Sequence, residues 1–129
     1  MAPGPEPTCP CGSGTSYVTC CGPLHDGAAA TTAEALMRSR YAAYATGRLD
    51  YVFRTWHPRT RPVDVEPAPG VTWSGLEVLR TEAGGTDDAT GTVVFRASYR
   101  TSDGEHVLQE ASRFERRAGR WVYVEGDVS

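Results

Sequence analysis

The hydrophobic positions of this chain follow two different periods, and the change lies near residue 71. Before residue 71, two apolar sets recur at helical spacing: Ala33, Leu36, Met37, Tyr41, Tyr44 and Ala45, and then Leu49, Val52, Phe53 and Trp56. The first set predicts a helix that ends at Gly47, and the second predicts a shorter helix that ends before Pro58. Thr31 and Glu34 have the spacing of a capping box, so we expect the first helix to begin there.

After residue 71, apolar and polar residues alternate, which is typical of strands with one buried face. We expect strands over 71–80, 90–100, 105–116 and 120–126, a turn over 82–88 and a short tail over 127–129. In the first strand, Trp73 is expected on one face and Leu76 and Val78 on the other. The proline-rich stretch before it allows at most a short strand around Val63. Helices followed by an antiparallel meander predict the α+β fold class.

The third strand carries charge on the face that we expect to be buried. Its even positions are His106, Leu108, Glu110, Ser112 and Phe114, and the apolar members make this the inner face. A buried carboxylate needs a partner. Arg40 falls within the apolar stripe of the first helix, so we hypothesise that Arg40 pairs with Glu110. Such a pair either ties the helix to the sheet or takes part in ligand binding.

All four cysteines of the chain lie within thirteen residues: Cys9, Cys11, Cys20 and Cys21. The first 30 residues contain too few apolar side chains to form a core, so this segment needs a metal or a cross-link to be ordered. A basic, apolar leader is missing at the start, which favours a reducing cytoplasm, where such clusters bind metal. The alternatives are a disulfide pair or unrelated reduced thiols. Four cysteine ligands would make a closed, structural zinc site, in which His25 is a neighbour rather than a ligand. Ser13 is expected to cap a helical turn over residues 15–20.

The motif Cys9-Pro-Cys11-Gly-Ser-Gly, followed by Cys20-Cys21, resembles the SEC-C zinc motif. Further stretches resemble the YchJ-like family of uncharacterised bacterial proteins: Cys21–His25, Ala33–Tyr41 and Thr55–Pro58. This resemblance implies a SEC-C knob, with its proline-rich lead and connector, over residues 1–30. It also implies a nuclear transport factor 2-like domain over residues 31–129, in which helices cover a curved sheet and leave a cone-shaped pocket.

The charge of the chain argues against some classes of partner. Thirteen basic residues face sixteen acidic ones, and no basic stripe is present, so nucleic acid is not the favoured partner. No apolar run is long enough to span a membrane.

The pattern and the resemblance together leave the specific role open. The favoured interpretation is a cytoplasmic zinc protein whose knob projects on a flexible alanine-rich connector and docks another protein. The alternative is a small-molecule binder, or an enzyme similar to ketosteroid isomerases and polyketide cyclases. In that enzyme Glu110, His57 and Tyr41 or Tyr99 would be the active groups. A third reading is that the thiolates transfer zinc onward. His57 would either face the mouth of the cone or cap a carbonyl group. The candidate pocket residues are Arg40, Tyr41, His57, Trp73, Tyr99, Glu110 and Ser112.

Overall fold

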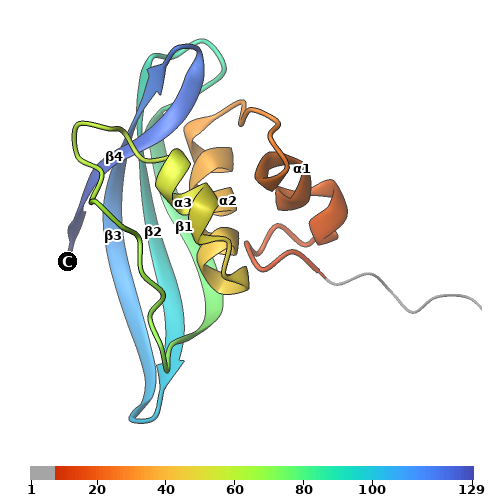
Figure 1. Cartoon of the computed structure of the whole chain (residues 1–129), viewed down its shortest axis with the longest axis vertical. Coiled ribbons are helices and arrows are strands. Elements are labelled where there is room, and N and C mark those ends of the chain that lie inside the picture. The colour runs from red at the N-terminus through yellow and green to blue at the C-terminus, as the bar shows by residue number, and fades with distance from the viewer. Residues whose placement is uncertain (1–7) are drawn as a thin grey trace, which may run out of the picture.

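The computed structural model describes residues 8–129 and has an α+β architecture, as predicted (Figure 1). Two helices, α2 (Ala33–Thr46) and α3 (Leu49–Arg54), cover one face of a four-stranded antiparallel sheet. The strands are β1 (Thr72–Ala83), β2 (Thr90–Thr101), β3 (Gly104–Arg117) and β4 (Arg120–Val128), in the spatial order β1-β2-β3-β4. A 3-10 turn, η1 (Tyr17–Thr19), and a short helix, α1 (Cys21–His25), lie on the far side of α2 from the sheet. Most of the proline-rich lead lies outside the described residues.

The helix α2 begins one residue later than the capping box suggested. Thr32 is the N-cap, and its hydroxyl oxygen accepts a 3.0 Å hydrogen bond from the backbone N–H of Ala35. The prediction that Thr31 caps the helix is therefore wrong by one position. Gly47 ends the helix in the left-handed conformation at a φ of 79°, as predicted.

The hydrophobic core lies between α2 and the concave face of the sheet. It is formed by buried residues from the helix and from three strands: Ala30, Ala33, Leu36, Met37, Tyr41, Val93, Phe95, Ala97, Phe114 and Trp121. Of the predicted inner positions of β3, Phe114 lies in this core, and the alternation of β2 brings Val93, Phe95 and Ala97 to the same side. Burial of this apolar surface is the main term that holds the helices against the sheet.

A β-bulge corrects the predicted faces of β1. The pairing of β1 with β2 shifts between Trp73 and Gly75, because one extra residue of β1 is accommodated there. As a result Trp73 faces the same side as Leu76 and Val78, and all three pack against the core. The prediction that Trp73 lies on the opposite face is wrong, since a strict period of two does not hold across a bulge.

The segment after α3 pairs with the edge of β4. The backbone N–H of His57 donates to the carbonyl of Tyr123 at 2.7 Å, and the N–H of Tyr123 donates to the carbonyl of Thr55 at 2.8 Å. This pairing fixes Thr55 and Trp56 beside the sheet. No strand forms at Val63 within residues 8–129, and β4 runs to Val128, so the tail predicted over 127–129 is mostly strand.

Within residues 8–129, no helix is long and apolar enough to cross a membrane.

Candidate metal centre and pocket

The four cysteine sulfurs form one compact group. All four Sγ atoms lie within 4.8 Å of one another, with Cys11 and Cys20 at 3.5 Å and Cys20 and Cys21 at 3.9 Å. Four sulfurs around a tetrahedral ion with Zn–S bonds of about 2.3 Å are separated by about 3.8 Å, so the spacing fits such an ion. Three of the side chains are buried and that of Cys20 is half-buried. The group predicted from the sequence can therefore hold a metal ion.

A tight loop brings the two cysteine pairs together. The N–H of Cys9 donates to the carbonyl of Thr15 at 2.8 Å, and Gly12 and Gly14 both adopt positive φ values that favour glycine. The hydroxyl of Ser13 lies 3.1 Å from the Sγ atom of Cys20. The N-cap of η1 is instead Ser16, so the prediction that Ser13 caps the helical turn is wrong. The hydroxyl of Ser13 instead contacts and orients the sulfur of Cys20.

The thiols of this group cannot ionise independently. A hydrogen bond from the thiol of Cys21 lowers the pKa of Cys11 to about 4, and the same contact raises the pKa of Cys21. Burial raises the pKa of Cys9. Several thiolates therefore coexist here only when a cation lies among them, which couples metal binding to proton release.

His25 is a buried neighbour of the cysteine group and not a ligand. Its Nε2 atom lies 2.8 Å from the carbonyl oxygen of Ser39, and its Nδ1 atom lies 2.6 Å from the hydroxyl of Tyr17. A carbonyl only accepts, so Nε2 carries the proton and Nδ1 accepts from Tyr17. Burial lowers the pKa of His25, which favours this neutral form.

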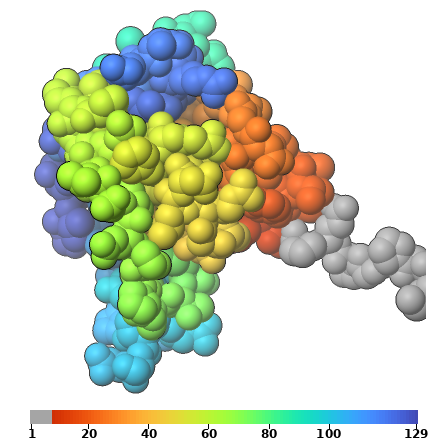
Figure 2. Space-filling view, in the orientation of Figure 1, coloured from red at the N-terminus to blue at the C-terminus, as the bar shows by residue number. Residues whose placement is uncertain are grey.

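The segment of residues 8–30, which we call the knob, packs directly against α2. The guanidinium of Arg38 donates to the carbonyl of Cys11 at 2.7 Å, and Ala42 packs against the cysteines. Arg54 donates to the carbonyl of His25 at 2.6 Å, and Ala30 of the connector is buried in the core. Figure 2 shows the red and orange knob lying against the yellow helices without separation. The expectation of a projecting knob on a flexible connector is therefore wrong.

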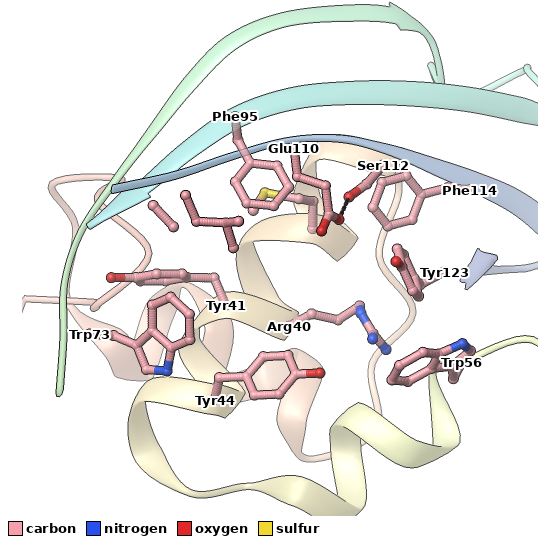
Figure 3. Close-up of a pocket in the computed structure, with 13 residues that line it drawn as sticks. Arg40, Tyr41, Tyr44, Trp56, Trp73, Phe95, Glu110, Ser112, Phe114 and Tyr123 are labelled. Atoms are coloured by element: carbon pink, nitrogen blue, oxygen red, sulfur yellow. Dashed lines mark hydrogen bonds between the residues drawn. The ribbon is translucent and has the colours of Figure 1, made fainter. Parts of the chain in front are cut away.

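A pocket of about 370 Å³ lies between α2 and the concave face of the sheet (Figure 3). Five candidate residues line it: Arg40, Tyr41, Trp73, Glu110 and Ser112. The remaining lining residues are Met37, Tyr44, Trp56, Phe95, Ala97, Leu108, Phe114 and Tyr123. The side chain of Tyr44 is 37 % exposed, so the pocket reaches solvent beside it.

Two candidate residues lie outside this pocket. His57 accepts a hydrogen bond at Nδ1 from the N–H of Arg59, and its Nε2 atom lies 3.8 Å from a carboxylate oxygen of Glu115. Tyr99 stacks on His106 and contacts Trp73 with ring centroids 5.4 Å apart, without itself lining the cavity. The bend of the chain at Pro58 directs His57 toward the end of β3, away from the cone.

Arg40 is buried as predicted, but its partners differ from those expected. Its Nη1 atom donates to the carbonyl of Val52 at 2.8 Å and to the hydroxyl of Thr55 at 2.7 Å. Its guanidinium lies 5.1 Å from the ring centroid of Trp56 and 4.7 Å from that of Tyr123. Within residues 8–129, no nitrogen of Arg40 lies within 4.0 Å of a carboxylate oxygen, so the direct ion pair with Glu110 is wrong. The free carbonyl groups at the end of α3 take the place of that carboxylate.

Glu110 and Ser112 point into the pocket from neighbouring inner positions of β3 (Figure 3). The hydroxyl of Ser112 donates to the Glu110 carboxylate, and Ser112 is 2 % exposed. The charge of Glu110 contributes to a raised pKa at Tyr123, although burial is the larger cause and the resulting value is about 12. The pocket thus contains one cation and one carboxylate that are not in direct contact.

The other lining residues are placed by the alternation of the strands, by the apolar stripe of α2 and by a pairing across the fold. Leu108 and Phe114 share the inner face of β3 with the candidates, and the alternation of β2 identifies Phe95. Tyr44 was part of the predicted helix stripe. Trp56 belongs to the predicted apolar face of the second helix, but its meeting with Tyr123 depends on the pairing of the segment after α3 with β4, which leaves no periodic signal in the sequence.

Comparison with known proteins supports one family. The sequence model described as "YchJ, middle NTF2-like domain" matches residues 32–126. A UPF0225 protein of Streptomyces coelicolor is 56 % identical over 124 residues, which cover 95 % of this chain and 97 % of that protein. A UPF0225 protein of Deinococcus radiodurans is 50 % identical and covers 94 % of this chain and 89 % of its own.

Two solved structures share the fold. The solution structure of a SEC-C motif containing protein from Rhodopseudomonas palustris has a TM-score of 0.81 at 38 % identity, and the match covers 92 % of this chain and 96 % of that one. The crystal structure of a SEC-C motif containing protein from Psychrobacter arcticus has a TM-score of 0.76 at 28 % identity, and the match covers 94 % and 82 %. The chain therefore belongs to the YchJ-like family of UPF0225 proteins, and residues 32–126 match its NTF2-like domain.

Proposed function

We propose that this protein binds a small organic molecule in the pocket, and that a structural zinc ion bound by Cys9, Cys11, Cys20 and Cys21 holds the pocket helix in place. The observation that carries the proposal is that α2 serves both sites. It supplies Arg40, Tyr41 and Tyr44 to the pocket, and its Arg38 holds the carbonyl of Cys11. Zinc suits four thiolates, and as a cross-link it supplies stability that a segment without its own core lacks.

The composition of the pocket supports ligand binding. A volume of about 370 Å³ falls at the lower end of the range of about 300–1,000 Å³ that small-molecule sites occupy. Its walls are mainly aromatic, and a small number of polar groups, including Arg40 and Glu110, are fixed by other residues. Such a combination gives orientation to a bound molecule.

Binding has more support than catalysis or partner docking. Acid–base chemistry in a related cone needs two titrating groups in different environments. Of the groups nominated from the sequence, Glu110 and Tyr41 line the cavity, whereas His57 and Tyr99 lie outside it. Docking of a partner through the knob is limited to its outer residues, among them 12–15, Val18 and Thr19, because α2 covers its inner face. A reducing compartment such as the cytoplasm belongs to the proposal, since the thiolates must stay reduced.

A thermal-shift panel of metabolites on the zinc-loaded protein tests the binding function. Leu108→Trp places a large side chain in the pocket, and Val107→Trp, on the opposite face of the same strand and 61 % exposed, is the matched control. We expect at least one compound that stabilises the wild type and Val107→Trp but not Leu108→Trp. A panel without any such compound would contradict the proposal. Elemental analysis should find one zinc per chain, and disulfides in place of metal would remove the structural role.

A further inference from the structure

Arg40 presents an unused edge of its guanidinium to the pocket. Arginine has five N–H donors, and the two bonds of Nη1 account for two of them. Within residues 8–129, Nε and Nη2 have no hydrogen-bond acceptor, although the residue is only 6 % exposed. The Nε and Nη2 hydrogens point in parallel, which is the geometry that binds both oxygens of a carboxylate.

Two phenols line the cavity near Arg40: the Tyr44 hydroxyl faces the guanidinium, whereas Tyr123 presents its ring to it. The hydroxyl groups of Tyr44 and Tyr123 also lack a hydrogen-bond partner among the described side chains and backbone, and both residues line the pocket. The close-up shows the Tyr44 hydroxyl directed toward the Arg40 guanidinium (Figure 3). Burial raises the pKa of each phenol, so both stay protonated and can donate a hydrogen bond. A buried cation with N–H and O–H donors that have no acceptor favours the binding of an anion.

From this arrangement we infer that the pocket takes a flat, apolar monocarboxylic acid whose carboxylate is bound by the Nε–Nη2 edge of Arg40 and by the hydroxyl of Tyr44. The inference rests on the proposed binding function. The apolar body of the acid lies against the aromatic wall of the cone, where Tyr41 and Trp73 meet edge to face with ring centroids 5.8 Å apart.

Glu110 sets the charge that the ligand can carry. Its carboxylate is fixed in the same cavity by Ser112, and among residues 8–129 no cationic side chain is in direct contact with it. One carboxylate on the ligand pairs with Arg40, whereas a second negative charge would face Glu110 inside a cavity of low dielectric constant. Dicarboxylates and phosphate monoesters are therefore excluded from the class.

Matched pairs of probes test this inference on the zinc-loaded full chain. We would use 2-naphthoate against 2-naphthamide, benzoate against benzamide, and naphthalene-2,6-dicarboxylate as the dianion. Binding is followed by the shifts of the indole N–H signals of Trp56 and Trp73. We expect each acid to bind at least about tenfold more tightly than its amide, and the dicarboxylate to bind more weakly than 2-naphthoate. Amides that bind as tightly as their acids would overturn the ligand class and leave the binding function standing.

Two variants test whether Arg40 and Glu110 determine the preference of the pocket for a single carboxylate. Arg40→Gln should remove the preference for acids, so that each acid binds no more tightly than its amide. Since Nη1 of Arg40 also holds the end of α3, Glu110→Gln gives a second test that keeps Arg40 in place. Glu110→Gln should strengthen binding of the acids severalfold relative to their amides and admit the dicarboxylate. Unchanged acid binding in Glu110→Gln would contradict the inference. If no probe binds while metabolites of another class shift the pocket signals, the ligand class is wrong and the binding function stands. If no compound binds, the binding function is wrong as well.

Discussion

The guanidinium of Arg38 joins the knob to α2 through one contact, a 2.7 Å hydrogen bond from Nη1 to the carbonyl oxygen of Cys11. The Nε atom of the same side chain lies 3.0 Å from a carboxylate oxygen of Glu34, one turn earlier in α2. Cys11 belongs to the metal-binding group, and Arg38 lies between Met37 and Arg40, which line the pocket. A change at the cysteines can therefore reach the pocket helix through Arg38, in addition to the packing of Ala42 on the cysteines.

Arg38→Ala should weaken the attachment of the knob. The lost bond joins a charged donor to a backbone carbonyl, for which typical contributions are about 1.5–3 kcal/mol, and the partial exposure of Arg38 places the effect near the lower end. We expect lower resistance to urea and faster transfer of zinc to a chelator. The control is Arg96→Ala, because Arg96 forms exposed contacts with Glu77 and Gln109 on the other face of the sheet. Equal effects of the two variants would show that the contact does not join the sites.

Removal of zinc should destabilise the whole described chain and not the knob alone. Cys9, Cys11 and Cys21 are buried against Ala42 of α2, and Leu76 of β1 packs on the same cluster. Loss of the ion leaves thiols that repel one another when charged, next to the central helix. We expect a chelator to lower the melting temperature reported by Trp121, which lies in the main core. A core signal that melts at the same temperature with and without zinc would make the knob an independent unit.

The periodicity of the sequence was sufficient to predict the main elements but not their exceptions. The apolar stripe placed α2, and the alternation of β2 and β3 placed Phe95, Glu110 and Phe114 on the inner face. The bulge at Gly75 reversed the face of Trp73, because an inserted residue changes every side chain on one side of it.

The sequence also could not predict which residues meet across the fold. It identified Arg40 as buried, yet the partners of Arg40 are a carbonyl and a hydroxyl near the end of α3 and two aromatic rings. Backbone acceptors carry no signal in the residue types. The docking of the knob could not be predicted for the same reason. Arg38 and Arg54 donate to the backbone carbonyls of Cys11 and His25, and such contacts do not depend on the identity of the accepting residue.

His25 should bind a proton less readily in the folded protein than in the unfolded chain, and its neutral form should carry the proton on Nε2. Burial lowers the pKa of His25 from its ordinary value of 6.5, so the unfolded chain binds a proton at pH values where the folded chain does not. This contribution to stability is complete above about pH 6.5 and is lost as the pH falls toward the folded pKa. Nitrogen-15 spectra of the imidazole check the tautomer. Zinc content is measured at each pH, so that only a loss of stability with zinc retained counts.

Tyr17→Phe should leave Nδ1 of His25 buried without a donor. The hydroxyl of Tyr17 lies 2.6 Å from this nitrogen, and an unsatisfied buried acceptor costs about 1–3 kcal/mol. Urea unfolding of the zinc-loaded variant measures the change. Tyr99→Phe is the control, because Tyr99 contacts its neighbours through its ring. A Tyr17→Phe variant as stable as Tyr99→Phe would show that His25 does not depend on this hydrogen bond.

Gly91→Ala should be among the most destabilising single-methyl additions to the sheet. A Cβ atom at residue 91 would lie 2.8 Å from the backbone nitrogen of Gly84 and 3.2 Å from the Cβ atom of Ala33. The backbones of Gly84 and Ala33 cannot easily move away from the added atom, because the carbonyl of Gly84 accepts a 2.9 Å hydrogen bond from the N–H of Ala33 at the start of α2.

The matched control for Gly91→Ala is Gly75→Ala, another strand glycine without a positive φ. Its added Cβ atom would meet no atom closer than 3.9 Å. Overpacking typically costs about 1–3 kcal/mol, so we expect Gly91→Ala to lose at least that much stability and Gly75→Ala to stay close to the wild type. Urea unfolding of both variants measures the difference. Because the crowded site lies where α2 meets the β1–β2 turn, a Gly91→Ala variant as stable as Gly75→Ala would mean that this junction can open without cost, and α2 would then not be held at its first turn.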